Sequence, residues 1–165
     1  MSDISQEMAA QAPPGGFAAA EYNEVAKRAF LEGIILQKCD FVVSPASLKN
    51  RGSWKLDHGR ELLACSYDSQ HGSVAGIFVY HFTAKDGRKN AAKCSAEYAV
   101  FYRVPADAKE EAAKGFCRNV GMFAAYPYFR ALVSRFSSEG NLNLPMLPAI
   151  ASTAHIPPKP KKNKA

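Results

Sequence analysis

Residues 73–103 read SVAGIFVYHFTAKDGRKNAAKCSAEYAVFYR, and this stretch decides the fold. Its first arm, Ser73–Thr83, is rich in the β-branched and aromatic residues that strands favour. Lys85–Lys89 holds an Asp-Gly pair, which is a strong signal of a tight turn between two strands. The second arm, Ala92–Arg103, alternates between apolar and polar residues. The stretch therefore predicts an antiparallel hairpin.

The two arms of this hairpin differ in how they are expected to be covered. The first arm is apolar on both faces, at Val74, Ile77, Phe78, Val79, Tyr80 and Phe82. Such a strand is usually covered on both sides, here by helices or by a partner subunit. One face of the second arm carries Cys94, Ala96, Tyr98, Val100 and Tyr102, and the other carries Lys93, Ser95, Glu97 and Arg103. We expect one face of that arm to be buried and the other to be largely solvated.

Two further strands are predicted upstream of the hairpin. Glu61–Asp68 is joined to the first arm through the turn Gln70–Gly72. Gly33–Val43 is rich in β-branched residues and is stopped by Pro45. Residues 44–60 lie between these two strands and are predicted to form a long crossing loop, which carries the only tryptophan, Trp54. The stretch 22–32 is either a short helix or an approach to the first strand, since Gly33 follows it.

Helices are predicted downstream of the hairpin. Pro105 ends the sheet, and Asp107, with Glu110 three residues later, forms a capping-box-like start. One helix is expected at Ala108–Met122, and a second is expected to begin near Pro127, because proline suits a first helical turn. Residues 137–141 end the second helix, and residues 142–148 are extended. Strands followed by helices predict an α+β fold, a four-stranded antiparallel sheet with C-terminal helices packed on it.

The length of 165 residues predicts one domain, at residues 21–152. Residues 1–20 are expected to be a flexible leader, and residues 153–165 a flexible Lys/Pro-rich tail. No apolar run approaches the about 20 residues that span a bilayer, and no secretory signal pattern is present. A cytoplasmic location follows from these observations.

Catalytic and metal-binding patterns are missing from the sequence. The cysteines, Cys39, Cys65, Cys94 and Cys117, are far apart and lack the paired spacing of metal ligands. We expect them to be reduced and mostly buried. No phosphate-binding loop, nucleophile elbow or zinc-protease motif occurs. The sequence therefore predicts neither an enzyme nor a cofactor or metal site.

The net charge of +6 leaves an alternative function open. Lys85, Arg88, Lys89 and Lys93 cluster around one turn, and the tail adds four lysines. Such clusters suit nucleic acid or an acidic partner. No recognised nucleic-acid motif accompanies them, so nucleic acid is not the first expectation.

Residues 121–148 read GMFAAYPYFRALVSRFSSEGNLNLPMLP and resemble the C-terminal signature of the SecB family. In that signature an aromatic-Pro-Tyr-x-Arg element opens the main helix, and a Leu/Pro-rich extended segment follows. The matching positions are Phe123, Tyr126, Pro127, Tyr128, Arg130, Leu142, Leu144, Pro145 and Pro148.

The resemblance implies a chaperone architecture and activity. SecB-like subunits assemble as dimers of dimers and hold unfolded or pre-export polypeptides in apolar grooves without ATP. They deliver these clients to the protein translocation machinery through the motor SecA. Members that serve general export are typically acidic and end in a further helix, and this chain departs from both features. The alternative is a dedicated chaperone of one client, such as an antitoxin.

Four aromatic residues are the candidate peptide-binding residues: Trp54, Phe123, Tyr126 and Tyr128. Aromatic side chains suit this role, because they bury a large area with few rotatable bonds. The alternative is that the helix aromatics pack the helix on the sheet, and that Arg130 bonds the carbonyls of a neighbouring segment.

Overall fold

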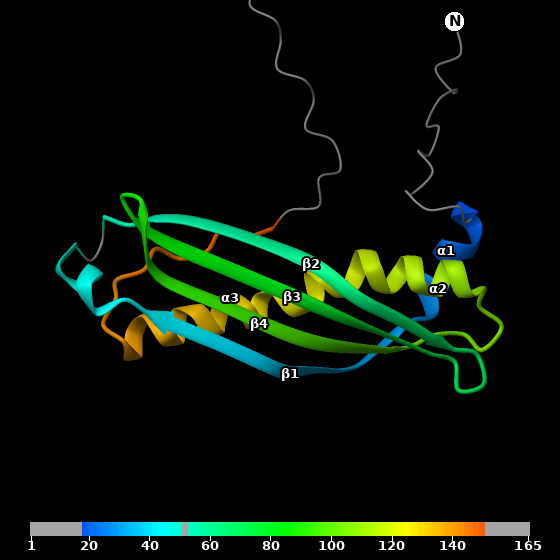
Figure 1. Ribbon diagram of the computed structural model, residues 1–165. Coiled ribbons are helices and arrows are strands. Elements are labelled where there is room, and N and C mark those ends of the chain that lie inside the picture. Colours follow the sequence, from blue (N-terminus) through cyan, green and yellow to red (C-terminus); the bar gives the residue numbers. More distant parts are fainter. Residues whose placement is uncertain (1–17, 51–52, 151–165) are drawn as a thin grey trace, which may run out of the picture.

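The computed structural model describes residues 18–50 and 53–150 (Figure 1). Its elements are α1 (Ala19–Arg28), β1 (Phe30–Val43), the 3-10 helix η1 (Pro45–Asn50), β2 (Lys55–Asp68), β3 (Ser73–Asp86), β4 (Lys89–Arg103), α2 (Glu110–Phe116), the π-helical turn η2 (Cys117–Gly121) and α3 (Met122–Glu139). Within the described ranges, none of the helices is both long and apolar enough to span a membrane. Residues 1–17 of the predicted leader and the whole predicted tail lie outside the described residues, while Ala19 and Ala20 belong to α1.

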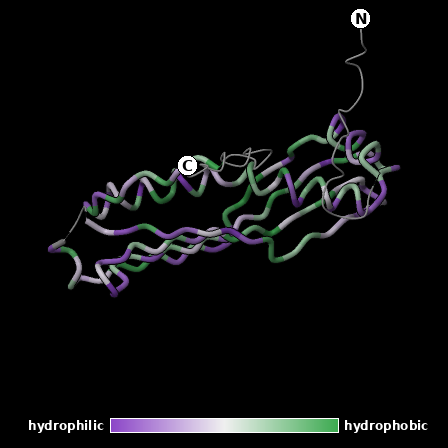
Figure 2. Tube along the Cα trace, turned by 90° about the horizontal axis from the view of Figure 1, so that it is seen from above, coloured by the Kyte–Doolittle hydropathy of each residue, from purple (hydrophilic) through white to green (hydrophobic). Residues whose placement is uncertain are grey.

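The strands form one antiparallel sheet in the order β1-β4-β3-β2. The helical run α2–η2–α3 crosses one face of this sheet, so that the molecule has two layers (Figures 1 and 2). The predicted α+β fold, a four-stranded antiparallel sheet followed by packed C-terminal helices, is confirmed. β3 and β4 lie in the centre of the sheet, and β1 and β2 form its edges.

The core lies between the helices and the central strands. Tyr80 of β3 is fully buried, and its ring stacks on Phe129 of α3 with the ring centroids 5.5 Å apart. The Tyr80 ring also contacts Tyr98 of β4 and Tyr126 of α3. The predicted buried face of the second arm is confirmed at Cys94, Ala96, Tyr98, Val100 and Tyr102. Alternation along the central strands therefore sends one set of large side chains under the helices.

The outer face of the sheet, which points away from the helices, is partly apolar. On this face Val79 is 8% exposed and Ala99 is 2% exposed, while Ile77 and Phe101 are half-buried. Helices therefore cover one of the two apolar faces of β3. That a partner subunit covers the other face stays a prediction.

The long crossing loop predicted at residues 44–60 is wrong in its second half. η1 occupies Pro45–Asn50, and β2 already begins at Lys55. Gly59 suggested a loop, yet it pairs with His81 across the ladder. The His81 ring fills the space that a side chain at Gly59 would need. Close packing across the strands thus explains a glycine inside a strand.

The helices also differ from the prediction. One helical run extends from Glu110 to Glu139, with the π-helical turn η2 in the middle and Pro127 inside α3. We attribute the continuity to the packing of Tyr126 and Phe129 on the sheet, which outweighs the hydrogen bond that proline removes. The prediction of Asp107 as the N-cap is wrong, because α2 begins at Glu110 and Lys109 is its N-cap. The Asp107 carboxylate instead lies 3.7 Å from the Arg28 guanidinium of α1.

The two alternatives for residues 22–32 resolve into a helix followed by a strand. α1 ends at Arg28, and β1 begins at Phe30, three residues before Gly33. Val25 of α1 is buried, and the Tyr22 ring lies 6.3 Å from that of Phe116 in α2. α1 is thus held against the start of the C-terminal helical run.

The contact between Gly121 and Phe78 predicts a strong effect of a single methyl group. A Cβ at Gly121 would lie 2.7 Å from the Phe78 ring, which is fully buried, so the ring or the helix would have to shift. Gly121→Ala should lower the free energy of unfolding by about 1–3 kcal/mol, although alanine favours a helix. Urea denaturation measures this change.

Gly33→Ala is the matched control for Gly121→Ala. A Cβ at Gly33 would have no atom within 4 Å, so its effect should stay within about 0.5 kcal/mol. Equal effects of the two substitutions would contradict the close packing at Gly121.

Candidate peptide-binding surface

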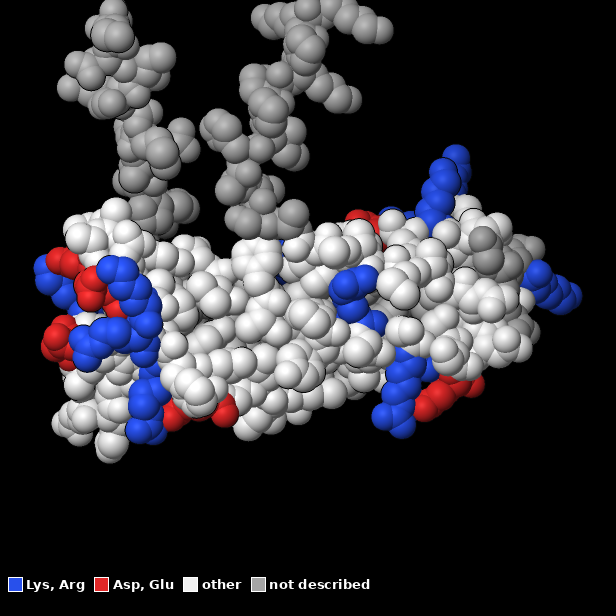
Figure 3. Space-filling view, turned by 180° about the vertical axis from the view of Figure 1, so that it is seen from behind, with Lys and Arg blue, Asp and Glu red and all other residues white. Residues whose placement is uncertain are grey.

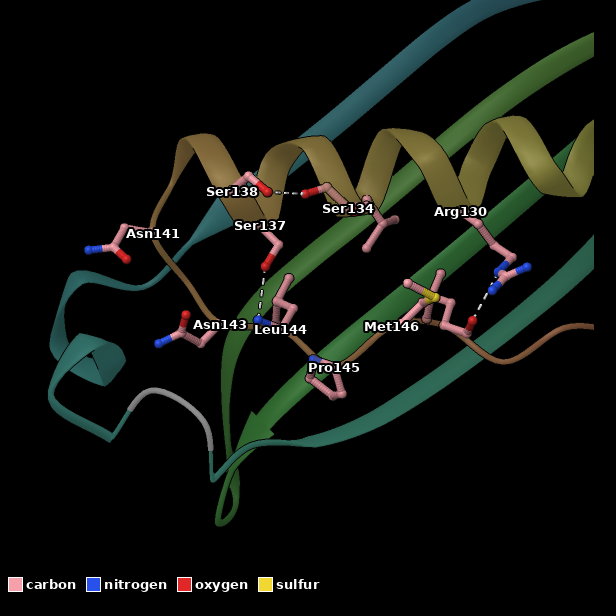
Figure 4. A pocket seen from close by; sticks show the side chains of 11 residues that line it. Arg130, Ser134, Ser137, Ser138, Asn141, Asn143, Leu144, Pro145 and Met146 are labelled. Carbon is pink, nitrogen blue, oxygen red and sulfur yellow. Dashed lines mark hydrogen bonds between the residues drawn. The ribbon is translucent and has the colours of Figure 1, made fainter.

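The chain reverses direction after α3 and returns along that helix. The backbone N–H of Gly140 donates to Phe136 O, and that of Leu142 donates to Ser137 O. Asn141 and Asn143 have φ values of 48° and 53°, in the left-handed region that asparagine tolerates better than most residues. These two residues bring Leu142–Pro148, which we call the strap, alongside α3 (Figure 4).

Side chains of α3 hold the strap by its backbone. Arg130 Nε donates to Leu147 O at 2.9 Å, and the Tyr126 hydroxyl donates to Pro148 O at 2.7 Å. Ser137 Oγ accepts from the Leu144 N–H at 2.9 Å. The prediction that Arg130 bonds the carbonyls of a neighbouring segment is confirmed. Because these bonds reach backbone atoms, they hold an extended chain whatever its side chains are.

Two leucines of the strap supply the apolar part of this contact. Leu142 is 1% exposed and Leu147 is 2% exposed, so both side chains are buried in the core. Burying a leucine contributes about 1.5–3 kcal/mol. α3 and the sheet therefore hold an extended segment with both backbone hydrogen bonds and apolar pockets.

A hollow of about 390 Å³ remains between α3 and the strap (Figure 4). Its lining mixes polar and apolar side chains: Arg130, Val133, Ser134, Ser137, Ser138, Asn141, Asn143, Leu144, Pro145, Met146 and Leu147. The Ser138 hydroxyl already donates to Ser134 O at 3.1 Å. This hollow therefore offers hydrogen-bonding groups from α3 beside apolar side chains of the strap.

The opposite flank of α3 is apolar and faces the edge strand β1. There a hollow of about 350 Å³ is lined by Ile34, Leu36, Tyr98, Tyr128, Ala131, Leu132 and Arg135, which we call the β1 flank. The side chains of Tyr128 and Leu36 are 55% and 43% exposed. β1 pairs only with β4 in the described part of the chain, so its second backbone edge is open. An apolar wall beside an open strand edge suits an added strand.

Charged side chains on the helix side lie mainly toward its two ends. Figure 3 shows a dense group of basic and acidic side chains at the end formed by α1 and α2 and a sparser group at the other end, while the middle of this face is largely uncharged. At the end formed by α1 and α2, Lys109 pairs with Glu21 of α1, and Lys114 lies 2.6 Å from Glu110. The uncharged middle belongs to α3 and its flanks.

The four predicted peptide-binding residues do not form one cluster. Trp54 is 6% exposed in the core, and its indole N–H has no hydrogen-bond partner among the described residues. Tyr126 is also 6% exposed, and burial raises the pKa of its hydroxyl. Phe123 is half-buried on the β2 side of α3, with the Arg60 guanidinium 5.5 Å from its ring centroid. Tyr128 alone is exposed, and it lies on the opposite flank.

Sequence reasoning missed Leu36, Leu132 and Arg135 of the β1 flank. A signal for the helical part was present, because Tyr128, Leu132 and Arg135 recur at helical spacing. Leu36 gave no comparable signal. The register of β1 shifts between Leu36 and Lys38, and such a bulge changes which side chains face the helix.

No metal centre accompanies these hollows in residues 18–50 and 53–150, where no group of three or more His, Cys, Asp or Glu side chains could hold an ion. Comparison with known proteins finds no matching family model and no matching curated protein.

Among solved structures, the chain resembles the Mycobacterium tuberculosis SecB-like chaperone Rv1957, solved in complex with a ChAD peptide from the Rv1956 HigA1 antitoxin. The TM-score is 0.67 at 20% sequence identity, over 80% of this chain and 96% of that one. A Streptococcus agalactiae protein of unknown function matches at a TM-score of 0.37 and 13% identity, over 73% of this chain and 94% of that one. The chain therefore has the SecB-like fold, as the resemblance of residues 121–148 predicts.

The hydrogen bond from Tyr126 to the strap predicts a difference between two neighbouring tyrosines. Tyr126→Phe removes the donor to Pro148 O and should lower the free energy of unfolding by about 1 kcal/mol. Tyr128→Phe changes an exposed ring and should have an effect within about 0.5 kcal/mol. Urea denaturation of both variants measures the difference, and equal stabilities would refute the role of this bond.

Proposed function

We propose that this protein is an ATP-independent SecB-like chaperone that holds an extended segment of a client polypeptide against α3. The observation that carries the proposal is the strap. Part of this chain already lies along α3, with two carbonyls bonded by Arg130 and Tyr126. The SecB-like neighbour, solved with an antitoxin peptide, supports the same function. Neither catalysis nor a cofactor is part of the proposal.

The β1 flank is the client site that we propose. The strap occupies one side of α3, whereas the β1 flank offers exposed Tyr128 and Leu36 on the other side. Fully burying one such side chain contributes about 1.5–3 kcal/mol. A few of these contacts, with backbone bonds to β1, reach the roughly 8 kcal/mol of micromolar affinity. Such binding tolerates many client sequences.

The other three predicted peptide-binding residues have different roles in the proposal. Phe123 is half-buried beside Arg60, and we propose it as a second contact on the β2 side. Trp54 and Tyr126 are buried in the core, so their first role is to stabilise the fold. Client contact by these two residues stays a prediction that needs local opening.

Of the two client ranges, we favour a dedicated client over general export. The solved neighbour is bound to a peptide of one antitoxin. The outer sheet face of this chain also carries both signs of charge, since Lys38 lies 3.6 Å from Asp40 and 3.8 Å from Glu97. This differs from the acidic face expected for docking to the motor SecA, so delivery to the translocation machinery is the weaker proposal.

We also propose that the protein self-associates and that it is located in the cytoplasm. The apolar outer face of the central strands, where Ile77 and Phe101 are half-buried, offers a second copy a surface for self-association. A homo-oligomer of this kind leaves the open edge of β1 free for the client. The four cysteines are free thiols, as is usual in a reducing compartment.

A second candidate function rests on the basic end of the sheet. Lys85, Arg88, Lys89 and Lys93 are exposed around the β3–β4 turn, and Lys55 stands directly opposite Lys85. Like charges in this position destabilise a sheet, a cost that an acidic partner would offset. Binding of a polyanionic oligonucleotide should then fall steeply with salt and lose part of that salt dependence in K85Q/K89Q. No binding at low salt would exclude this candidate.

The chaperone proposal predicts suppression of aggregation without nucleotide. At stoichiometric amounts the protein should keep a reduced, unfolded test protein soluble, as measured by light scattering. The double variant L36S/Y128A should bind a fluorescent unfolded client at least about tenfold more weakly, because it loses two apolar contacts on the β1 flank. Fluorescence anisotropy measures this affinity.

Leu63→Ser is the matched control for the double variant. Leu63 is an exposed leucine of the other edge strand, β2, and it is 55% exposed. This control should bind the client like the wild type. Light scattering gives the mass of each variant, which separates weaker client binding from a changed oligomer. Full binding by L36S/Y128A, or an equal loss in L63S, would overturn the assignment of the β1 flank.

A further inference from the structure

The four cysteines, which are far apart in sequence, lie in the fold as two pairs. Cys39 of β1 and Cys94 of β4 stand diagonally across one ladder, and Cys65 of β2 stands opposite Gly76, beside which the sulfur of Cys117 in η2 lies. All four are free thiols. Each pair has one half-buried and one buried member, but the pairs differ in their charged neighbours, and that difference gives one of them a distinct chemistry.

Packing at a glycine brings Cys65 and Cys117 together. Cys65 stands opposite Gly76 in the β2–β3 ladder, on the face that the helices cover. A Cβ at Gly76 would lie 2.9 Å from the Cys117 sulfur, so the missing side chain makes room for that sulfur. The Cys65 thiol also points at the backbone carbonyl of Lys114, one turn before Cys117, with Sγ 3.9 Å from that oxygen. The sulfurs of Cys65 and Cys117 therefore lie where the edge strand β2 contacts the π-helical turn η2.

Cys65 and Cys117 differ in exposure and in the pKa of their thiols. Cys65 is half-buried at the edge of the sheet, whereas Cys117 is fully buried. The hydrogen bond from Cys117 is the main cause that lowers the pKa of Cys65 to about 7, and the Arg118 and Lys114 cations add to it. Lys114 shares its charge with Glu110, so Arg118 is the stronger of the two. The hydrogen bond to Cys65, followed by burial, raises the pKa of Cys117. Cys65 is therefore the accessible nucleophile and Cys117 its covered neighbour.

The second pair shows the same contrast in exposure but has no cation beside it among the causes that shift the pKa of its thiols. Burial raises the pKa of Cys39 and raises that of Cys94 to about 12. The charged neighbour of this pair is Asp40, an acid that disfavours a thiolate. Cys39 and Cys94 are therefore neighbouring thiols of which neither is expected to be reactive. They serve as an internal control for Cys65 and Cys117.

We propose that Cys65 and Cys117 form a peroxide-oxidised dithiol site. The Cys65 thiolate attacks a hydroperoxide, here hydrogen peroxide. With one proton taken up, this gives a sulfenic acid at Cys65 and one water. The Cys117 sulfur then attacks the Cys65 sulfur and forms the disulfide, while the hydroxyl leaves as a second water with the Cys117 proton. Two thiols lose two electrons in total, and one hydrogen peroxide is reduced to two waters.

The disulfide would tie the helix layer to the edge of the sheet. Cys117 lies where α2 passes into α3, and Cys65 lies on β2, which is otherwise paired only with β3 in the described residues. A covalent link there restricts the separation of η2 from β2. Amide hydrogen exchange in residues 110–121 should therefore slow at least severalfold upon oxidation.

Tryptic peptide mapping tests the proposal, because trypsin places the four cysteines in four different peptides, at 39–49, 61–85, 94–103 and 115–118. The reduced protein is treated with equimolar hydrogen peroxide, alkylated and digested without reductant. The expected product links peptide 61–85 to peptide 115–118. Cys39 and Cys94 should be recovered as alkylated thiols. The same treatment in denaturant should lose this selectivity.

Serine variants assign the role of each sulfur. C117S should trap the sulfenic acid at Cys65, which dimedone labels, and C65S should leave Cys117 reduced. C39S should form the link at the wild-type rate. If C117S does not fold, as judged by circular dichroism, C117A replaces it. A link between Cys39 and Cys94 that forms first, or a Cys65 that remains a thiol while the protein is folded, would overturn the proposal.

Discussion

The packing of one tyrosine, Tyr80, supports the arrangement of the whole molecule. Its ring is fully buried in the middle of β3 and contacts Tyr98 of β4 and Tyr126 and Phe129 of α3. Its hydroxyl donates to Met122 O, at the first residue of α3, over 2.5 Å. Burial raises the pKa of this hydroxyl, because a phenolate would lose its hydration there. Tyr80 thus sets where α3 starts on the sheet and which side of it faces the strands. The strap and the β1 flank take their positions from α3.

Much of the fold could be predicted from local patterns, and the errors have physical causes. The alternation of residues 92–103 gave the buried face of β4 correctly, because a central strand keeps a strict period of two. The sequence around Gly59 predicts a loop, since the ring of His81 that explains a glycine there belongs to another strand. Pro127 predicts a helix start, yet the packing of its neighbours on Tyr80 continues the helix through it. In both cases a contact between distant residues decided a local structure.

The candidate site was less predictable than the fold. The motif in residues 121–148 led to the fold and to the bond from Arg130 to the strap, because both depend on residues close in sequence. The motif does not indicate which of its aromatic residues are exposed. Tyr126 and Tyr128 are two residues apart on a helix, so one faces the core and the other faces solvent. The partners of Tyr128 on β1, about ninety residues earlier in the chain, follow from the sheet order and its bulges, which a single sequence does not display.

The π-helical turn η2 has a consequence for how the length of this chain can vary. A π-helical turn holds one more residue than an ordinary helical turn, and here it joins α2 and α3 so that both bury side chains against the same sheet. Each residue of a helix advances by about 100° around the axis. Losing one residue from the regular parts of α2 or α3 would therefore turn the rest of the helical run by that angle, and a loss before Tyr126 would carry its ring away from Tyr80. Losing one residue from Cys117–Gly121 would instead leave an ordinary helical turn, with α3 near its present orientation. Homologous chains that keep the arrangement should therefore place a one-residue gap in this helical run at η2.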